Sequence, residues 1–380
     1  MTSLRWPGWA RHPVPASAPG RLAPPWRALA LGSCLAVAIA LAPAATRGVR
    51  AQVAPRNTWP IKTREHVDLW LHGFAFVAPD SSPVPLYRAG YRDAMIVARN
   101  AASAITELDA NADVLRSAIR ARPNLLGAQF IPMEFGTWAE LDAAMEAFIR
   151  ADGDPNRAGR NDAALVARLA SVFRTKDDRD FARRFMLGLR SEREKFHHEW
   201  WLAETRRRDA ALTAVDSLWR TRYRPALQSF LNHTQQRDGE VILSTVLEAE
   251  GRTVTGGAQG NTIVVGFPER PEHAADAIYC LMHEMVGTIT SAAVADNVTP
   301  AQTRSGEADK YQSLALVRGG AILAAHVGAD AATAYQKFYL RATGHADTGD
   351  VAAAFAAAFP LPEAMLSSIE RQVAVAFSGI

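Results

Sequence analysis

Apolar residues recur at helical spacing through most of the chain between residues 61 and 237. This periodicity predicts a dense apolar helix near 67–76 and further helices at 87–103, 113–121, 138–150 and 162–173. The long charged segment 178–235 carries one apolar stripe, which is typical of helices with one buried and one solvated face. Pro225 is expected to break or kink the last of these helices.

The pattern changes after residue 237. Short runs rich in β-branched residues, with glycines between them, predict strands at 241–247, 253–255 and 261–267. Because short turns separate successive runs, we expect a small antiparallel three-stranded meander. After it, the apolar spacing predicts helices at about 272–295, 300–325 and 329–343, and a final helical pair up to residue 380.

These elements predict an α+β fold class that is predominantly helical. A helical region is expected at residues 52–237, and a small sheet plus helices at 238–380. A cleft is expected where the two regions face each other.

Residues 1–51 have the pattern of a signal peptide. They contain arginines and no Asp or Glu, an apolar run lies at 28–41, and a small-residue cleavage site precedes Gln52. This predicts export to the periplasm or the cell exterior. Two alternatives stay open: a lipid anchor at Cys34, and an uncleaved helical anchor, although the run is shorter than the roughly 20 residues that span a bilayer.

Removal of this leader changes the charge of the chain. The whole sequence has a net charge of +3, and loss of the six leader arginines brings it to about −3. The run Arg206-Arg207-Arg208 is flanked by acids and is expected to be a solvated helical turn. We therefore expect no nucleic-acid partner. No later apolar run reaches membrane length, and Cys280 is left without a disulfide partner.

The richest chemical motif lies at residues 283–287. In the pattern H-E-x-x-H, two histidines on one helical face bind zinc, and the glutamate acts as general base on zinc-bound water. His283 and Glu284 match the first two positions, and Gly287 stands where the second histidine belongs. Glu307 offers a further carboxylate at the start of the next helical pattern.

This order and spacing resemble the gluzincins, the thermolysin-like zinc metallopeptidases whose third ligand is a glutamate on the following helix. The resemblance covers about the last third of the chain. It implies that His283 and Glu307 bind zinc, that Glu284 polarises water, and that the substrate is a peptide or protein. It also implies that the strand before the His-Glu helix is a sheet edge that pairs with extended substrate. His345 could resemble the later gluzincin residue that stabilises the oxyanion, or replace the missing ligand.

Gly287 keeps a second class of function open. Zinc sites normally use three or four protein ligands, so the chain could be a pseudoenzyme, a non-catalytic exported binding or envelope-associated protein on the same frame. His326 is excluded as a ligand because one helix separates it from Glu307 by roughly 28 Å.

Two other histidine positions are expected to be structural. Glu194-x-x-His197 lacks the second copy that a di-metal helical bundle needs. His72 lies among aromatic residues and is expected to be a core histidine with its hydrogen bonds satisfied.

Overall fold

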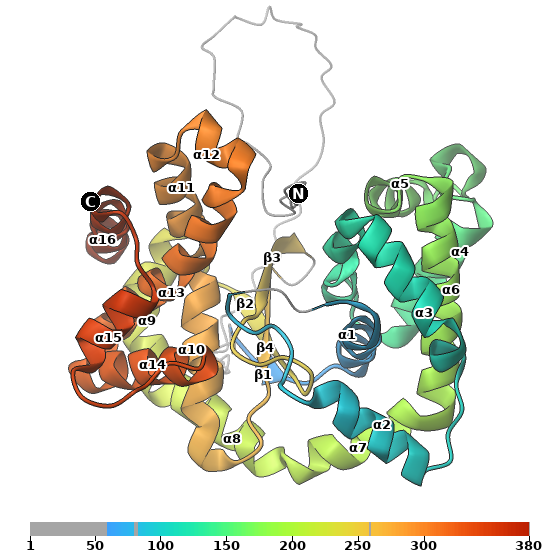
Figure 1. The fold of residues 1–380 in the computed structure, drawn as a ribbon, viewed down its shortest axis with the longest axis horizontal. Coiled ribbons are helices and arrows are strands. Elements are labelled where there is room, and N and C mark those ends of the chain that lie inside the picture. The colour runs from blue at the N-terminus through green and yellow to red at the C-terminus, as the bar shows by residue number, and fades with distance from the viewer. Residues whose placement is uncertain (1–58, 80–82, 258–259, 380) are drawn as a thin grey trace, which may run out of the picture. The chain divides into compact units, whose positions relative to one another are not determined.

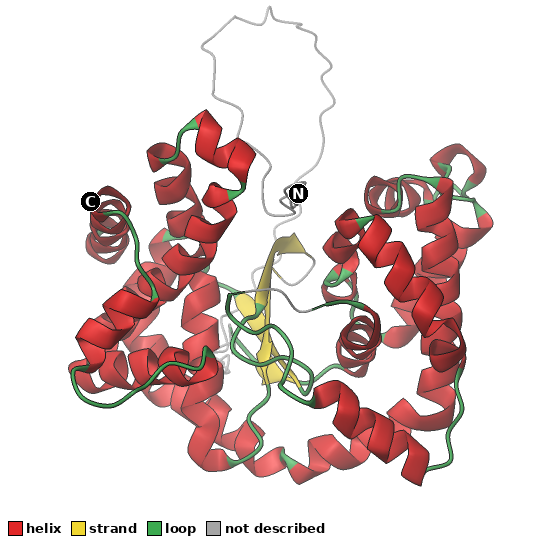
Figure 2. Cartoon of the chain, viewed as in Figure 1, coloured by secondary structure: helices red, strands yellow, loops and turns green. Residues whose placement is uncertain are grey.

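A four-stranded mixed sheet lies between two groups of helices in the computed structural model, which describes residues 59–79, 83–257 and 260–379 (Figure 1). The strand order is β1-β2-β4-β3, with β1, β2 and β4 parallel and β3 antiparallel to β4. The strands are β1 (Ile61–Lys62), β2 (Gly239–Ser244), β3 (Arg252–Gly257) and β4 (Gly260–Gly266). Helices make up most of the described chain (Figure 2), so the predominantly helical α+β prediction is confirmed.

The prediction of an antiparallel meander is wrong. β4 does not follow β3 outward but lies between β2 and β3, and it pairs with β2 in parallel. Both β2 and β4 are buried along almost their whole length. Parallel strands are usually buried on both faces, and their sequences are therefore nearly continuous apolar runs. The sequences of β2 and β4 have this pattern.

The connection between β2 and β3 crosses the end of β4. A Cβ on Gly266 would lie 2.8 Å from the Leu247 carbonyl oxygen and 2.7 Å from that of Glu248, so this crossing needs a glycine. Backbone hydrogen bonds from Glu248 to Leu86 (2.9 Å) and from Ala249 to Pro85 (3.2 Å) hold the connection on its other side.

The first group of helices packs on one face of the sheet, through the side chains of Ile242 and Val264. Its helices are α1 (Glu65–Val77), α2 (Tyr91–Ala101), α3 (Glu107–Ala121), α4 (Trp138–Arg150), α5 (Ala163–Val172), α6 (Lys176–Glu192) and α7 (His198–Arg207). A π-helical turn, Arg193–His197, joins α6 to α7.

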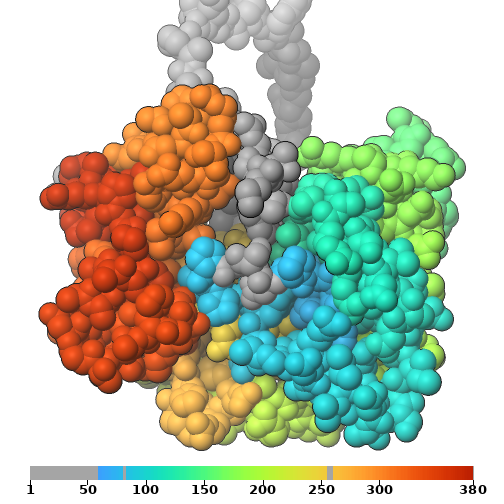
Figure 3. All heavy atoms as spheres, in the orientation of Figure 1, coloured from blue at the N-terminus to red at the C-terminus, as the bar shows by residue number. Residues whose placement is uncertain are grey.

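The second group packs on the opposite face, through Val241 and Ile263. Its helices are α8 (Asp209–Leu218), α9 (Arg224–His233), α10 (Ala274–Met285), α11 (Gly287–Asn297), α12 (Pro300–Ser305), α13 (Glu307–Val327), α14 (Ala329–Ala342), α15 (Val351–Ala358) and α16 (Glu363–Ser378). The two helical groups are thus separated by the sheet. On the face drawn in Figure 3, helices of the first group (cyan to green) lie on the right and the carboxyl-terminal helices of the second group (orange to red) lie on the left.

Three predicted helices are interrupted. Pro225, where the sequence predicts a break or kink, lies in the first turn of α9, and a second π-helical turn directly before it joins α8 to α9. The expected helix 272–295 bends by 45° between α10 and α11, where Gly287 is a weak helix former. The expected helix 300–325 is divided by Gly306, whose φ of 80° lies in the left-handed region.

No single helix among residues 59–79, 83–257 and 260–379 is long and apolar enough to cross a membrane, although two strongly bent helix pairs reach that length and apolarity together. Residues 1–51, where the sequence predicts a signal peptide, lie outside the described residues.

Candidate functional site

His283 lies on α10, the helix that packs along β4, and its side chain is only 1% exposed. The Tyr339 ring of α14 stacks on the imidazole, with 5.4 Å between ring centroids and 17° between planes. Neither ring nitrogen has a hydrogen-bond partner in the described part of the chain. Burial, helped by the charge of Arg252, lowers the pKa of His283 to about 3, so the imidazole is neutral at physiological pH.

Glu284 is also buried, and it contacts the edge of the sheet. The hydroxyl of Thr253 in β3 donates to Glu284 Oε2 at 3.1 Å. Burial raises the pKa of Glu284 to about 7, although Arg252 and the Thr253 hydrogen bond act in the opposite direction. Glu284 Oε1 lies 3.9 Å from His283 Nε2, which is too long for a hydrogen bond. Both groups are neutral between about pH 3 and 7, so they form a polar contact and not an ion pair.

The structure does not bring Glu307 to this pair. Helix α13 packs antiparallel to α11 with Gly319 against Val286 and Thr290, where an added Cβ would lie 3.1 and 2.9 Å from their side chains. Glu307 is the first residue of α13, about three turns or 18 Å along the helix axis before Gly319. Its carboxylate accepts a hydrogen bond from Tyr311 at 2.7 Å.

His345 lies in the exposed turn after α14 and does not contact His283. Its Nδ1 lies 3.0 Å from the hydroxyl of Thr343. The ring of Phe359 lies between it and Tyr339, with centroids 6.2 Å from His345 and 6.4 Å from Tyr339. Tyr339, which the sequence did not single out, is therefore the residue that covers His283.

The described residues do not fit a zinc site. They contain no group of three or more His, Cys, Asp or Glu side chains that could hold a metal ion, whereas zinc normally takes three or four protein ligands. At Gly287, the position of the missing ligand, an added Cβ would meet nothing closer than Leu316 at 3.9 Å. A Cβ could therefore be accommodated there, so crowding at the first side-chain atom does not require this glycine.

The sheet edge beside Glu284 is β3, not the strand directly before the helix. The expectation that β4 is the edge is therefore wrong, because β4 is covered by β3 on one side and β2 on the other. A Cβ on Gly251 would lie 2.3 Å from the Val264 carbonyl oxygen and 3.1 Å from Glu284 Cγ, so only glycine lets β3 begin so close to the helix. Gly251 is thus the sequence feature that permits this contact.

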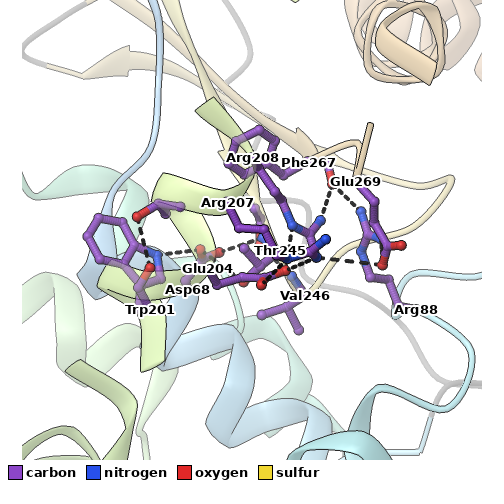
Figure 4. Close-up of polar contacts among 12 residues, drawn as sticks. Asp68, Arg88, Trp201, Glu204, Arg207, Arg208, Thr245, Val246, Phe267 and Glu269 are labelled. Carbon is purple, nitrogen blue, oxygen red and sulfur yellow. Dashed lines mark hydrogen bonds and ion pairs between the residues drawn. The ribbon is translucent and has the colours of Figure 1, made fainter. Parts of the chain in front are cut away.

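A second polar cluster lies at the carboxyl ends of β2 and β4 (Figure 4). Asp68 is fully buried and accepts hydrogen bonds from Trp201 (2.8 Å) and from the backbone (3.2 Å) and hydroxyl (3.1 Å) of Thr245. Arg88 and Arg208 both donate to the carbonyl oxygen of Phe267. These ends of parallel strands are where α/β proteins usually bind ligands, but here the carboxylate of Asp68 is occupied by donors from the protein.

The position of Arg208 corrects the sequence analysis. The run 206–208 was expected to be solvated, yet Arg208 is 4% exposed and also pairs with Glu204. The break between α7 and α8 turns this side chain inward.

His72 has the satisfied hydrogen bonds that the sequence predicts. Its Nδ1 lies 2.9 Å from the Tyr91 hydroxyl and its Nε2 3.0 Å from Glu192. Burial alone would raise the pKa of Glu192. The opposite effects are larger and lower this pKa to about 2: they come from the hydrogen bond and charge of His72, the hydrogen bond of Thr106 and the charge of Arg99.

His197 is buried beside His72, with 5.1 Å between ring centroids, while Glu194 is exposed. The π-helical turn therefore directs the two members of Glu194-x-x-His197 to different surroundings, and a shared metal site is not formed.

The chain matches no protein-family model, no curated protein and no solved structure.

Proposed function

We propose that this protein is an exported peptide-binding protein on a zinc-peptidase-like frame, and that it does not hydrolyse the peptide it binds. The observation that carries the proposal is the hydrogen bond between Thr253 of the terminal strand β3 and the buried Glu284 of the His-Glu helix. It joins the proposed peptide-binding edge to the residue that acts as general base in gluzincins.

The sheet supports peptide binding at β3. This strand is last in the sheet order, and no other strand among the described residues pairs with its second edge. A terminal strand presents backbone N–H and C=O groups that an extended peptide can pair with. The gluzincin resemblance implies a peptide-binding sheet edge at the strand before the helix, and we transfer this role to β3, the terminal strand that contacts the glutamate.

The surroundings of His283 and Glu284 favour binding over zinc-dependent hydrolysis. Gly287 offers no ligand, Glu307 is at the far end of α13, and Tyr339 covers the imidazole. Zinc-dependent hydrolysis of peptides remains the alternative. Metal analysis of protein purified without a His-tag separates the two, since the proposal predicts well below one zinc per chain.

A backbone-directed experiment tests the proposed binding. Decapeptides are selected from a random phage-displayed library on the immobilised full chain, synthesised, and titrated by calorimetry. Two derivatives carry N-methyl groups at the odd or the even positions, so that each blocks one edge of the peptide. We expect one derivative to lose at least about tenfold in affinity and the other to bind normally.

Three results would overturn the proposal. They are a library that yields no binder, equal binding of both methylated derivatives, and cleavage of the peptide that stops on chelation and returns with zinc.

We also propose export, on the basis of the arginine-rich, acid-free leader and its apolar run at 28–41. Mass spectrometry of the protein from its native cell should find an amino terminus near Gln52, or a lipid-modified Cys34. A cytoplasmic protein that begins at Met1 would contradict this part.

A further inference from the structure

A surface cavity of about 490 Å³, open to solvent on one side, lies among α13, α14, α15 and α16. Its apolar wall includes Ile322, Phe355 and Leu366, and its polar lining includes Arg318, Gln336 and Glu370. The other lining residues are His326 and five alanines, and the small alanine side chains leave the space between the helices open. None of the lining residues belongs to the sheet or to α10, so this site is separate from the proposed peptide-binding edge.

Arg318 supplies the one guanidinium among the residues that line this cavity. Its guanidinium is half-buried and lies over the ring of Phe355, 5.7 Å from the ring centroid. It has no hydrogen bond or ion pair with any residue that the structure describes. Burial lowers the pKa of Arg318. The negative charge of Glu370 is close enough to raise the pKa of Arg318, which opposes the effect of burial. The Arg318 nitrogens are not fully buried, so a ligand can reach them from solvent, and the planar guanidinium fits a carboxylate with two parallel hydrogen bonds.

We propose that this cavity binds a monocarboxylate with an apolar tail, such as a medium-chain fatty acid. The carboxylate pairs with Arg318, and the tail lies against Ile322, Phe355 and Leu366. The volume is in the range of small-molecule sites, which are mostly apolar with a few polar groups that orient the ligand.

Glu370 makes the proposal more specific. Its carboxylate is exposed, shares the cavity with Arg318 and forms no ion pair among the described residues. It repels an anionic ligand and would attract a cationic one. A ligand with one negative charge at one end therefore suits the cavity better than a dianion.

Calorimetric titration of the full chain with decanoate and with decylamine tests the site. We expect decanoate to bind at least about tenfold more tightly than decylamine, and Arg318→Met to remove this preference by weakening decanoate at least about tenfold. Glu370→Gln should strengthen decanoate binding by removing the repelling charge. Arg371→Met is the matched control, because this exposed neighbour does not line the cavity, and it should leave binding unchanged.

A second variant tests the tail. Ala352→Leu on α15 narrows the cavity from its exposed side, so it should weaken decanoate without changing the charge of the site. No binding of decanoate, equal binding of decylamine, or an unchanged affinity in Arg318→Met with a normal melting temperature would each overturn the proposal.

Discussion

The hydroxyl of Thr253 donates to the carboxylate of Glu284 across 3.1 Å and joins the terminal strand β3 to the His-Glu helix α10. This contact makes the strand edge and the buried carboxylate parts of one site. It also places a titratable group directly beneath the edge at which we propose that a peptide binds.

Thr253→Val should raise the pKa of Glu284 above about 7. The substitution keeps the shape of the side chain but removes the hydrogen bond that favours the ionised carboxylate. A ¹³C NMR titration of the glutamate carboxyls measures the change. Thr262→Val on β4 is the control, because its hydroxyl faces Glu240 and not Glu284. An unchanged pKa in Thr253→Val would show that the hydrogen bond does not form in solution.

Glu284→Gln should stabilise the protein at high pH and not at low pH. The pKa of Glu284 is about 7 in the folded state and 4.5 when unfolded, so its ionisation favours unfolding as the pH rises from 4.5 to 7. The variant should therefore exceed the wild type in free energy of unfolding by up to about 3 kcal/mol above pH 7, and the difference should vanish near pH 4.5.

Urea denaturation of both proteins at pH 5 and pH 8 measures this difference. His283, whose pKa is about 3 when folded and 6.5 when unfolded, stabilises the fold increasingly as the pH rises from 3 to 6.5. It titrates in both proteins, so its contribution cancels in the comparison. If the difference in free energy of unfolding between the variant and the wild type does not grow from pH 5 to pH 8, the burial of Glu284 is contradicted.

Local periodicity was sufficient to predict most helices of this chain. The predicted helices at 138–150, 162–173 and 329–343 correspond to α4, α5 and α14 within a few residues. Sheet topology was not predictable in the same way, because turn residues indicate where a strand ends but not which strand it will pair with. The continuous apolar runs of β2 and β4 did carry the parallel signal, and only the short turns between the strands argued against it.

Gly287→Ala should raise the free energy of unfolding by about 0.5–1 kcal/mol. Gly287 is in a helix, its φ is not in the left-handed region, and a Cβ there would be 3.9 Å from its nearest neighbour. The matched variant Gly320→Ala should lower the free energy of unfolding by about 1–3 kcal/mol, because its Cβ would lie 2.1 Å from the buried Tyr335 hydroxyl. Thermal unfolding of the two variants measures both effects. Equal effects of the same sign would contradict the packing described at these glycines.

Glu192→Gln should destabilise the fold by about 3 kcal/mol at neutral pH, since it removes the charge that faces the buried Arg99. Because the folded pKa of Glu192 is about 2, its stabilising effect is complete above pH 4.5 and is lost as the pH falls towards 2. The loss of free energy of unfolding in Glu192→Gln should therefore become smaller as the pH falls from 4.5 towards 2. Glu194→Gln, two residues away and exposed, should have almost no effect in the same denaturation experiments. A similar loss in both variants would show that Glu192 is not held in the network.

The candidate site was predictable in its residues and not in its geometry. His283 and Glu284 were identified from their adjacency in one helix, which local sequence determines. Whether Glu307 and His345 approach them depends on how α13 and α14 pack, and uncharged small residues lie at these contacts: Gly319 of α13 lies against Val286 and Thr290, and Gly320 lies against Tyr335 of α14. Thr253 and Tyr339 were missed because each reaches the site from a different element through tertiary contacts alone.

The most direct test of the central claim is amide hydrogen exchange of the full chain with and without a saturating selected decapeptide. Pairing of the peptide with β3 should slow exchange at residues 252–257 at least about tenfold, with zinc neither added nor required. Tight binding of the peptide with no change in exchange at residues 252–257, or protection that appears only after zinc is added, would contradict the account.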